Sequence, residues 1–194
     1  MKSRGFESAL FLISALLLGR WASNAWEAHV FQASALRALD HGTSIARGEI
    51  VGRLVVPSIG VDAAVAEGVD TRTLRHAVGH IPGTALPGGG GNVALAGHRD
   101  TFLAKLGRVR LGDEIRIETP EHVYRYAVES RRVVGPTAME VIAPAPRSIL
   151  TLVTCYPFHV LGPAPERFVV QARLKQVDQA PATAVSVMET AGRR

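Results

Sequence analysis

The segment Leu150-Thr-Leu-Val-Thr-Cys155-Tyr-Pro157 contains the features that decide the fold and the chemistry of this chain. Its β-branched and apolar residues predict a strand. Pro157 ends that strand, because proline lacks the N–H group that a central strand donates. Cys155 is therefore expected at the rim of a sheet. It is the only cysteine among 194 residues, which excludes an intramolecular disulfide, a paired-cysteine redox centre and a zinc site built on several thiolates.

Other segments before and after this strand in the sequence are also rich in β-branched and apolar residues, and most of them are bounded by glycine, proline or aspartate. With it, the expected strands are 53–57, 61–66, 92–96, 113–118, 122–134, 148–154 and 168–174. Two short helical segments, 70–78 and 101–106, interrupt them. Because strands and helices do not alternate regularly, we expect a mostly β fold, either an antiparallel barrel or a sandwich. A hydrophobic content of 47% is sufficient for one such core.

The first residues have the composition of an export signal. Lys2 and Arg4 precede the apolar run 9–18, and the positive-inside rule places them in the cytoplasm with the rest of the chain outside. The run is shorter than the roughly 20 residues of a simple membrane span. Three alternatives therefore stay open, namely an uncleaved anchor, a signal peptide cleaved after Ala25, and a buried helix of a soluble protein. We expect a single-pass anchor in residues 1–26.

The rest of the chain divides into a stalk, a globular part and a tail. Apolar residues at helical spacing after Trp26 predict a helical stalk that breaks at Asp40. The glycine-rich stretch 82–91 lacks the Gly-Lys-Ser/Thr ending of a nucleotide-binding loop, so it predicts an ordinary loop. We expect an anchor, a helical stalk with its linker, a β domain and a disordered tail, at residues 1–26, 27–48, 49–176 and 177–194.

The charge of the chain does not indicate a nucleic-acid partner. There are 22 Lys and Arg against 17 Asp and Glu, a formal charge of +5. The signs are interleaved, as in residues 111–118, rather than gathered into one stripe. Asp113, Glu114 and Glu118 are interpreted as a solvated strand edge and not as a calcium site. We expect no metal, no cofactor and no nucleic acid.

Three polar side chains at strand ends are candidates for a nucleophilic site. Taken singly, Cys155, His98 and Arg167 are each more typical of packing or of an ordinary surface. Together they fit acyl transfer, because a thiol with a pKa of about 8.5 needs a base such as His98 to supply thiolate at neutral pH. Arg167 offers a permanent charge for the oxyanion that attack on a carbonyl develops. Spacing alone does not show that the three strand ends converge.

These three segments, in this order, closely resemble the sortase family of membrane-anchored cysteine transpeptidases. The family signature T-L-x-T-C is matched by Thr151-Leu-Val-Thr-Cys155. The family histidine follows a glycine, as in Gly97-His98, and its arginine stands in a context like Arg167-Phe-Val-Val170. The resemblance covers about residues 52–175 together with the N-terminal segment, and the surroundings of the histidine and the cysteine look most like class D.

The resemblance implies a closed eight-stranded β-barrel and a transpeptidation outside the cytoplasmic membrane. Cys155 would cleave an L-P-x-T-G-like sorting signal near the C-terminus of a secreted protein, forming a thioacyl-enzyme. An amine from a cell-wall precursor or a pilin lysine would resolve it. His98 would act as acid and base, Arg167 would stabilise the oxyanion or hold the substrate, and Thr154 would contact the substrate. The N-terminal helix would contact membrane lipid.

Two other functions stay open. The chain would be an exported cysteine peptidase if water resolved the thioacyl intermediate. It would be a non-catalytic anchored barrel if Cys155 were merely packed. Transfer to an added amine separates the first alternative from a transpeptidase, and alkylation of the thiol tests the second.

Overall fold

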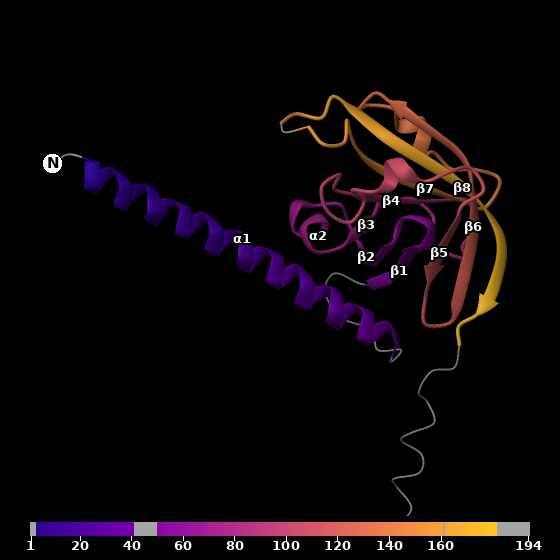
Figure 1. Cartoon of the computed structure of the whole chain (residues 1–194). Coiled ribbons are helices and arrows are strands. Elements are labelled where there is room, and N and C mark those ends of the chain that lie inside the picture. The colour runs from indigo at the N-terminus through magenta and orange to yellow at the C-terminus, as the bar shows by residue number, and fades with distance from the viewer. Residues whose placement is uncertain (1–2, 41–49, 161, 182–194) are drawn as a thin grey trace, which may run out of the picture.

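The computed structural model describes residues 3–40, 50–160 and 162–181, as one long helix followed by a β-barrel (Figure 1). Helix α1 spans Ser3–Asp40. The strands are β1 Ile50–Val56, β2 Val61–Glu67, β3 Val78–His80, β4 Asn92–Gly97, β5 Glu114–Glu118, β6 His122–Val134, β7 Ile149–Tyr156 and β8 Glu166–Gln179. The connections include α2 Thr71–His76 and the 3-10 helices η1 Pro57–Ile59, η2 Leu106–Arg108 and η3 Met139–Ile142.

The sheet closes on itself in the order β1-β2-β3-β4-β7-β8-β6-β5, with β5 paired to β1. Neighbouring strands run antiparallel except for two parallel pairs, β2 with β3 and β4 with β7. The expectation of a mostly β, closed eight-stranded barrel with short helices is confirmed. The sequence pattern gave no indication of the two parallel pairs, because periodicity reports which face of a strand is buried and not the direction of its neighbour.

Alternate side chains of the strands fill the barrel, and a loop segment closes one end of it. Leu54, Leu95 and Leu152 are completely buried in one hydrophobic cluster, as the two-residue period of a strand requires. Leu103 and Leu106 belong to the same cluster and are also completely buried. They follow β4, so the chain folds back over the mouth of the barrel at the end where β4 stops.

Strand β3 was not expected from the sequence, which placed residues 70–78 in one helix. Helix α2 ends at His76, and the chain continues as a strand from Val78. The start of α2 agrees with the expectation, because the carboxylate of Asp70 accepts the backbone N–H groups of Arg72 and Thr73. The single turn expected at 101–106 is observed as hydrogen-bonded turns that lead into η2, so no longer helix forms there.

Strand β8 is longer than the expected 168–174 at both ends. It pairs with β6 over almost its whole length, from Arg167 opposite Val134 to Gln179 opposite His122. An ion pair of 2.7 Å between Arg125 Nε and Asp178 Oδ2 also joins the two strands near the end of β8. The expected tail therefore begins within a strand, while residues 182–194 lie outside the described residues, as does the whole of the expected linker 41–48.

Helix α1 combines the expected anchor and stalk in one continuous helix, which ends at Asp40 as expected. Its second half packs beside α2, β1 and β2, and its first half extends away from the barrel (Figure 1). None of the helices in the described part of the chain contains an apolar stretch sufficient to cross a membrane. The expected membrane anchor is therefore not supported by the composition of this helix, and the proposed division of the chain into domains stays a prediction.

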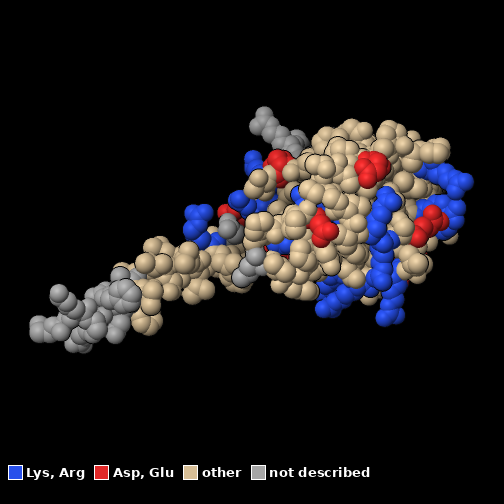
Figure 2. Space-filling model, turned by 90° about the horizontal axis from the view of Figure 1, so that it is seen from above, with Lys and Arg blue, Asp and Glu red and all other residues tan. Residues whose placement is uncertain are grey.

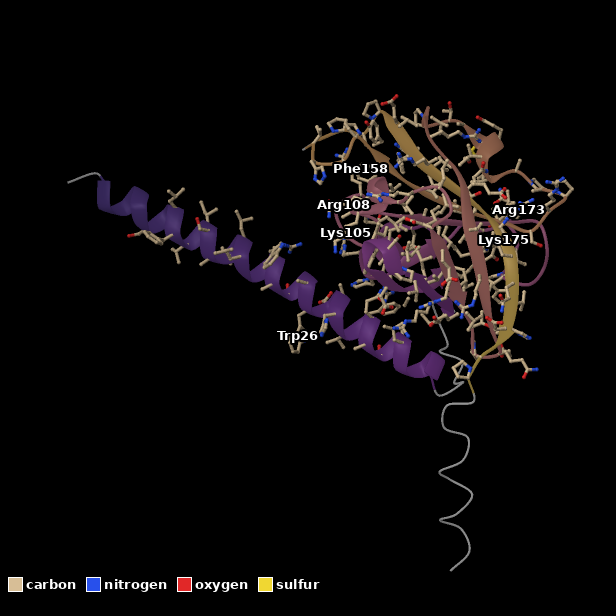
Figure 3. All side chains as sticks on the ribbon, turned by 45° about the vertical axis from the view of Figure 1, so that its right-hand side comes forward. Trp26, Lys105, Arg108, Phe158, Arg173 and Lys175 are labelled. Carbon is tan, nitrogen blue, oxygen red and sulfur yellow. The ribbon has the colours of Figure 1, made fainter. Side chains whose placement is uncertain are left out.

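Charged side chains of the barrel form ion pairs between neighbouring strands. Arg53 pairs with Asp62 at 2.6 Å, and Glu129 pairs with Arg173 at 2.6 Å and with Lys175 at 3.5 Å. Arg173 and Lys175 lie close together on β8 in Figure 3. On the face shown in Figure 2, acidic side chains lie between the basic ones. This is the mixed surface that the interleaved sequence predicts, while the absence of a nucleic-acid partner stays a prediction.

Candidate active site

The strand ends that carry the three candidate residues lie side by side. Cys155 is near the end of β7, and its register partner on the antiparallel strand β8 is Arg167. On the other side, β7 runs parallel to β4, and Thr154 is paired with Gly97, the residue before His98. The structure thus brings together three segments that are far apart in the sequence. Their catalytic roles stay a prediction.

The alternation of side chains directs Cys155 and Arg167 to the outer face of the barrel. On β7, Leu150 and Leu152 belong to the hydrophobic cluster inside the barrel. Cys155 is offset from them by an odd number of residues and therefore points outward. Directly paired residues of antiparallel strands share a face, so Arg167 points outward as well. Cys155 is a free cysteine of intermediate exposure, which leaves the thiol within reach of a molecule from outside.

Thr154 has a different environment from its neighbour. Its side chain is 2% exposed, and its hydroxyl donates a hydrogen bond of 2.8 Å to the carbonyl oxygen of Gly97. This bond joins the ends of β7 and β4, directly beside Cys155 and His98. In the structure, Thr154 therefore fixes the spacing of two strand ends from inside the barrel. Its substrate contact, which the family resemblance implies, stays a prediction.

Arg167 is oriented by the end of the loop that precedes it. Its Nη1 donates to the carbonyl oxygens of Ala164 at 3.0 Å and of Glu166 at 2.9 Å. Both bonds use the same nitrogen, and a guanidinium carries further N–H donors on its other nitrogens. Arg167 can thus be held in place by its own loop while it presents a positive charge beside its register partner Cys155.

An aromatic cluster supports the start of the β7–β8 loop, residues 157–165. The rings of Tyr156 and Phe158 meet edge to face with centroids 5.8 Å apart, and Phe158 meets Phe168 at 5.4 Å. Phe158 also packs on Gly107, where an added Cβ would lie 2.8 Å from the ring. Figure 3 shows Phe158 beside the segment that carries Lys105 and Arg108. The loop next to the thiol is thereby fixed to the segment that closes the barrel.

A buried polar network fastens the β6–β7 connection to the barrel near the starts of β4 and β7. Asn92 Nδ2 donates to the carbonyl oxygens of Val141 at 3.0 Å and Ala143 at 3.1 Å, and Thr151 Oγ1 donates to Asn92 Oδ1 at 2.7 Å. Sequence reasoning did not assign a role to Asn92 or to Thr151 outside the family signature. The sequence did contain an indication of a buried hydrogen-bonding role, because both are polar residues within otherwise apolar strands.

Arg99 is a further residue of the site that sequence reasoning missed. It follows His98, and its guanidinium donates to the carbonyl oxygens of Pro157 at 2.8 Å and Gly162 at 2.7 Å. It therefore links the end of β4 to the β7–β8 loop. The sequence carried no signal for this contact beyond the position of Arg99 next to the candidate histidine.

Comparison with known proteins agrees with this geometry. The family model of the sortase domain matches residues 54–175, which include all the candidate residues and every strand except the start of β1 and the end of β8. The chain belongs to the sortase family. Sortases are cysteine transpeptidases, and the confirmed resemblance includes at least part of each strand of the barrel.

Individual relatives support the same assignment. The chain is 30% identical to sortase D of Bacillus subtilis over 127 residues, and 27% identical to sortase A of Bacillus anthracis over 116 residues. These matches cover 65% and 58% of this chain but only 64% and 55% of the relatives, so the chain spans less than two thirds of their length.

Solved sortase structures extend the similarity to three dimensions. A sortase D5 transpeptidase of Clostridium perfringens superposes with a TM-score of 0.67 at 25% identity, over 76% of this chain and 98% of that chain. Sortase A of Listeria monocytogenes superposes with a TM-score of 0.63 at 26% identity, over 69% and 92%. The barrel described above is therefore the sortase fold.

Proposed function

We propose that this protein is a cysteine transpeptidase that cleaves an L-P-x-T-G-like sorting signal and transfers the acyl part to an amine. The observation that carries the proposal is the strand register, in which Cys155 pairs with Arg167 and Thr154 pairs with the residue before His98. A nucleophile, an imidazole and a guanidinium at adjoining strand ends are the groups that acyl transfer needs. Membership of the sortase family supports the same reaction.

In the proposed reaction, the Sγ of Cys155 attacks the carbonyl carbon of the Thr–Gly bond. N–H donors of Arg167 stabilise the resulting oxyanion. When this intermediate collapses, the C–N bond breaks and His98 gives a proton to the leaving amine. His98 then takes a proton from the incoming amine, which attacks the thioester carbon and releases the Cys155 thiolate. One amide bond replaces another, so the exchange needs no external source of energy.

The surface beside the thiol supports a peptide substrate. Ala96, Val153 and Val169 are register partners across β4, β7 and β8, and they form an apolar row next to Cys155 on the outer face. Ala96 and Val153 are half-buried and thus accessible. An apolar floor with a few polar groups at one end is typical of a ligand site. It suits the leucine and proline side chains of the proposed sorting signal.

We further propose that the enzyme acts outside the cytoplasmic membrane, with the N-terminus inside. The support is a group of large apolar side chains on the first half of α1 that are more than half exposed: Leu10, Phe11, Leu12, Ile13, Leu16, Leu17, Leu18 and Trp21. Exposed apolar surface of this extent is typical of contact with lipid or with another protein. Fractionation of cells that express the full chain tests this part of the proposal, which fails if the protein is found outside the membrane fraction.

An amine-transfer assay tests the proposed reaction. The full chain is incubated with a peptide that contains L-P-x-T-G, with triglycine or a lysine amide as the acceptor, and the products are identified by mass. We expect a product that carries the acceptor. Cys155→Ala should abolish it, and His98→Ala and Arg167→Ala should each lower kcat/KM by about 10²- to 10³-fold. Thr137→Ala, at an exposed position on the β6–β7 connection, is the matched control and should change nothing.

The same assay decides between the alternatives. Release of the peptide to water alone, at any acceptor concentration, would identify a peptidase instead of a transpeptidase. If the Cys155→Ala variant retained full turnover, the proposed mechanism would be wrong. A Cys155 thiol that resists a small alkylating reagent in the folded protein would favour the non-catalytic barrel.

A further inference from the structure

Arg99 joins two distant points of the β7–β8 loop with one side chain. Nη1 donates to the carbonyl oxygen of Pro157 at 2.8 Å, and Nη2 donates to that of Gly162 at 2.7 Å. Pro157 follows Cys155 by two residues, and Gly162 lies five residues further along the loop. The guanidinium itself comes from the residue after His98. One planar group therefore connects the segment of the candidate base to the start and to the middle of the loop beside the candidate nucleophile.

The backbone of this loop has a positive φ at two positions, one of which is not a glycine. His159 has a φ of 62°, in the left-handed region that side chains other than glycine rarely occupy. Gly162 has a φ of 104°. His159 and Val160 are both exposed, so burial of these side chains does not compensate for the backbone strain. Such a conformation persists only when surrounding contacts impose it, and the two bonds from Arg99 are contacts of that kind.

The β7–β8 loop borders the apolar row that we assign to the peptide. It begins directly after Tyr156 and ends at Glu166, the neighbours of Cys155 and Arg167 on their strands. Phe158 anchors its start on Gly107, but the two left-handed residues lie beyond this anchor. A displacement of the loop would thus change the wall of the groove while the strands that carry Cys155 and Arg167 keep their register.

We propose that Arg99 is a positioning residue that holds the β7–β8 loop as a wall of the peptide groove, and so determines the affinity for the sorting peptide more than the reactivity of Cys155. This inference rests on the proposed function, because it concerns the same groove. Arginine suits the role better than lysine, since its fork presents two donors at a fixed spacing to two carbonyl oxygens. A lysine ammonium carries its donors on one atom and lacks that geometry.

Hydrogen exchange tests the contact without any assumption about activity. In the full-length protein, Arg99→Ala should raise the exchange rate of the amides of residues 158–160, 162 and 164 by about tenfold, the loss expected for charge-assisted hydrogen bonds. Arg99→Lys should give a smaller increase. Arg131→Ala is the matched control, because Arg131 Nη1 also donates to a backbone carbonyl, that of Val109 at 2.8 Å, but outside this loop. Equal exchange of the loop in the wild type and in Arg99→Ala would overturn the proposal.

Kinetics test the consequence for the peptide. Arg99→Ala should raise KM for the sorting peptide by about tenfold, with kcat and the rate of alkylation of Cys155 within about twofold of the wild type. Arg99→Lys should restore part of the affinity, and Arg131→Ala should leave KM unchanged. A fall in kcat or in alkylation at constant KM would contradict the positioning role. If the wild type cleaves no sorting peptide, the proposed function fails, and the exchange experiment still decides whether Arg99 holds the loop.

Discussion

Asp113 connects two segments near the mouth of the barrel by accepting hydrogen bonds. Its Oδ2 accepts from the hydroxyl of Ser58 at 2.7 Å and from the backbone N–H of Arg110 at 2.9 Å. These bonds, with the backbone N–H of Arg110 as the largest cause, hold the pKa of Asp113 below its ordinary value of 3.8. Because the carboxylate form is favoured in the folded state, the stabilisation is present at neutral pH and is lost as the pH falls through the folded-state pKa.

Replacement of this carboxylate should reduce the acid sensitivity of the protein. We expect Asp113→Asn to be less stable than the wild type at pH 7, and the difference to shrink as the pH is lowered below about 4. Urea denaturation at a series of pH values from 3 to 7 measures it. A constant difference in the free energy of unfolding over this range would contradict the assignment. Some acid sensitivity should remain in the variant, because hydrogen bonds also lower the pKa of Asp70 and of Asp178.

The residues of the candidate site differ in how far the sequence predicted them. Cys155 was recognisable as a strand-end thiol because Pro157 follows it, and the family signature supplied His98 and Arg167. The bonds of Arg99 were not predictable, since it contacts Pro157 across 58 positions of the chain. Such hydrogen bonds depend on how loops that follow different strands are arranged in space, and local sequence patterns contain no information about that arrangement.

Among the secondary-structure elements, β3 is the strand that the residue pattern of the sequence does not predict. It has three residues, Val78–His80, too few to display an alternation. Its position depends instead on pairing with β2 and β4, and on the hydrogen bond from the Gly68 N–H to the His80 carbonyl oxygen at 3.0 Å. The longer β6, in contrast, was predicted at 122–134, because thirteen residues with β-branched and aromatic character give a clear pattern.

Close packing at β3 leads to a test of this element. A Cβ at Gly79 would lie 2.2 Å from the carbonyl oxygen of Gly68, a backbone atom that cannot easily move. We expect Gly79→Ala to lower the free energy of unfolding by at least about 1–3 kcal/mol, the usual cost of overpacking. Gly135→Ala is the control, because nothing lies within 4 Å of its added Cβ. Equal unfolding midpoints for the two variants in urea would show that β3 is not packed in this way.

At the scale of the whole molecule, α1 is attached to the barrel through Gln32. Its Oε1 accepts the backbone N–H of Ala64 in β2 at 2.7 Å, and its Nε2 donates to the carbonyl oxygen of His76 at the end of α2. The ring of Phe31 packs at a tilt of 45° beside the ring of His76, with centroids 5.8 Å apart. Ala64 is completely buried, so its N–H depends on this contact. The second half of the helix is therefore part of the folded domain.

Loss of the Gln32 contact should destabilise the barrel itself. Gln32→Leu leaves the Ala64 N–H without its side-chain acceptor, and we expect the free energy of unfolding to fall by about 1–3 kcal/mol. Ser34→Ala on the same helix is the control, since the Ser34 hydroxyl bonds only to the carbonyl oxygen of Phe31 in its own turn. If chemical denaturation gave the same stability for Gln32→Leu and Ser34→Ala, the helix would not be docked through Gln32.

Intact-mass spectrometry can detect whether Cys155 forms a thioacyl-enzyme that an amine resolves. The full chain is mixed with an L-P-x-T-G peptide in the absence of an acceptor, quenched with acid and weighed, and a second sample receives triglycine before quenching. We predict a mass increase equal to the acyl fragment, located on Cys155, which disappears when triglycine is added and is absent in Cys155→Ala. Peptide cleavage without any acyl adduct on Cys155, or an adduct that persists in Cys155→Ala, would rule out Cys155 as the nucleophile of this reaction.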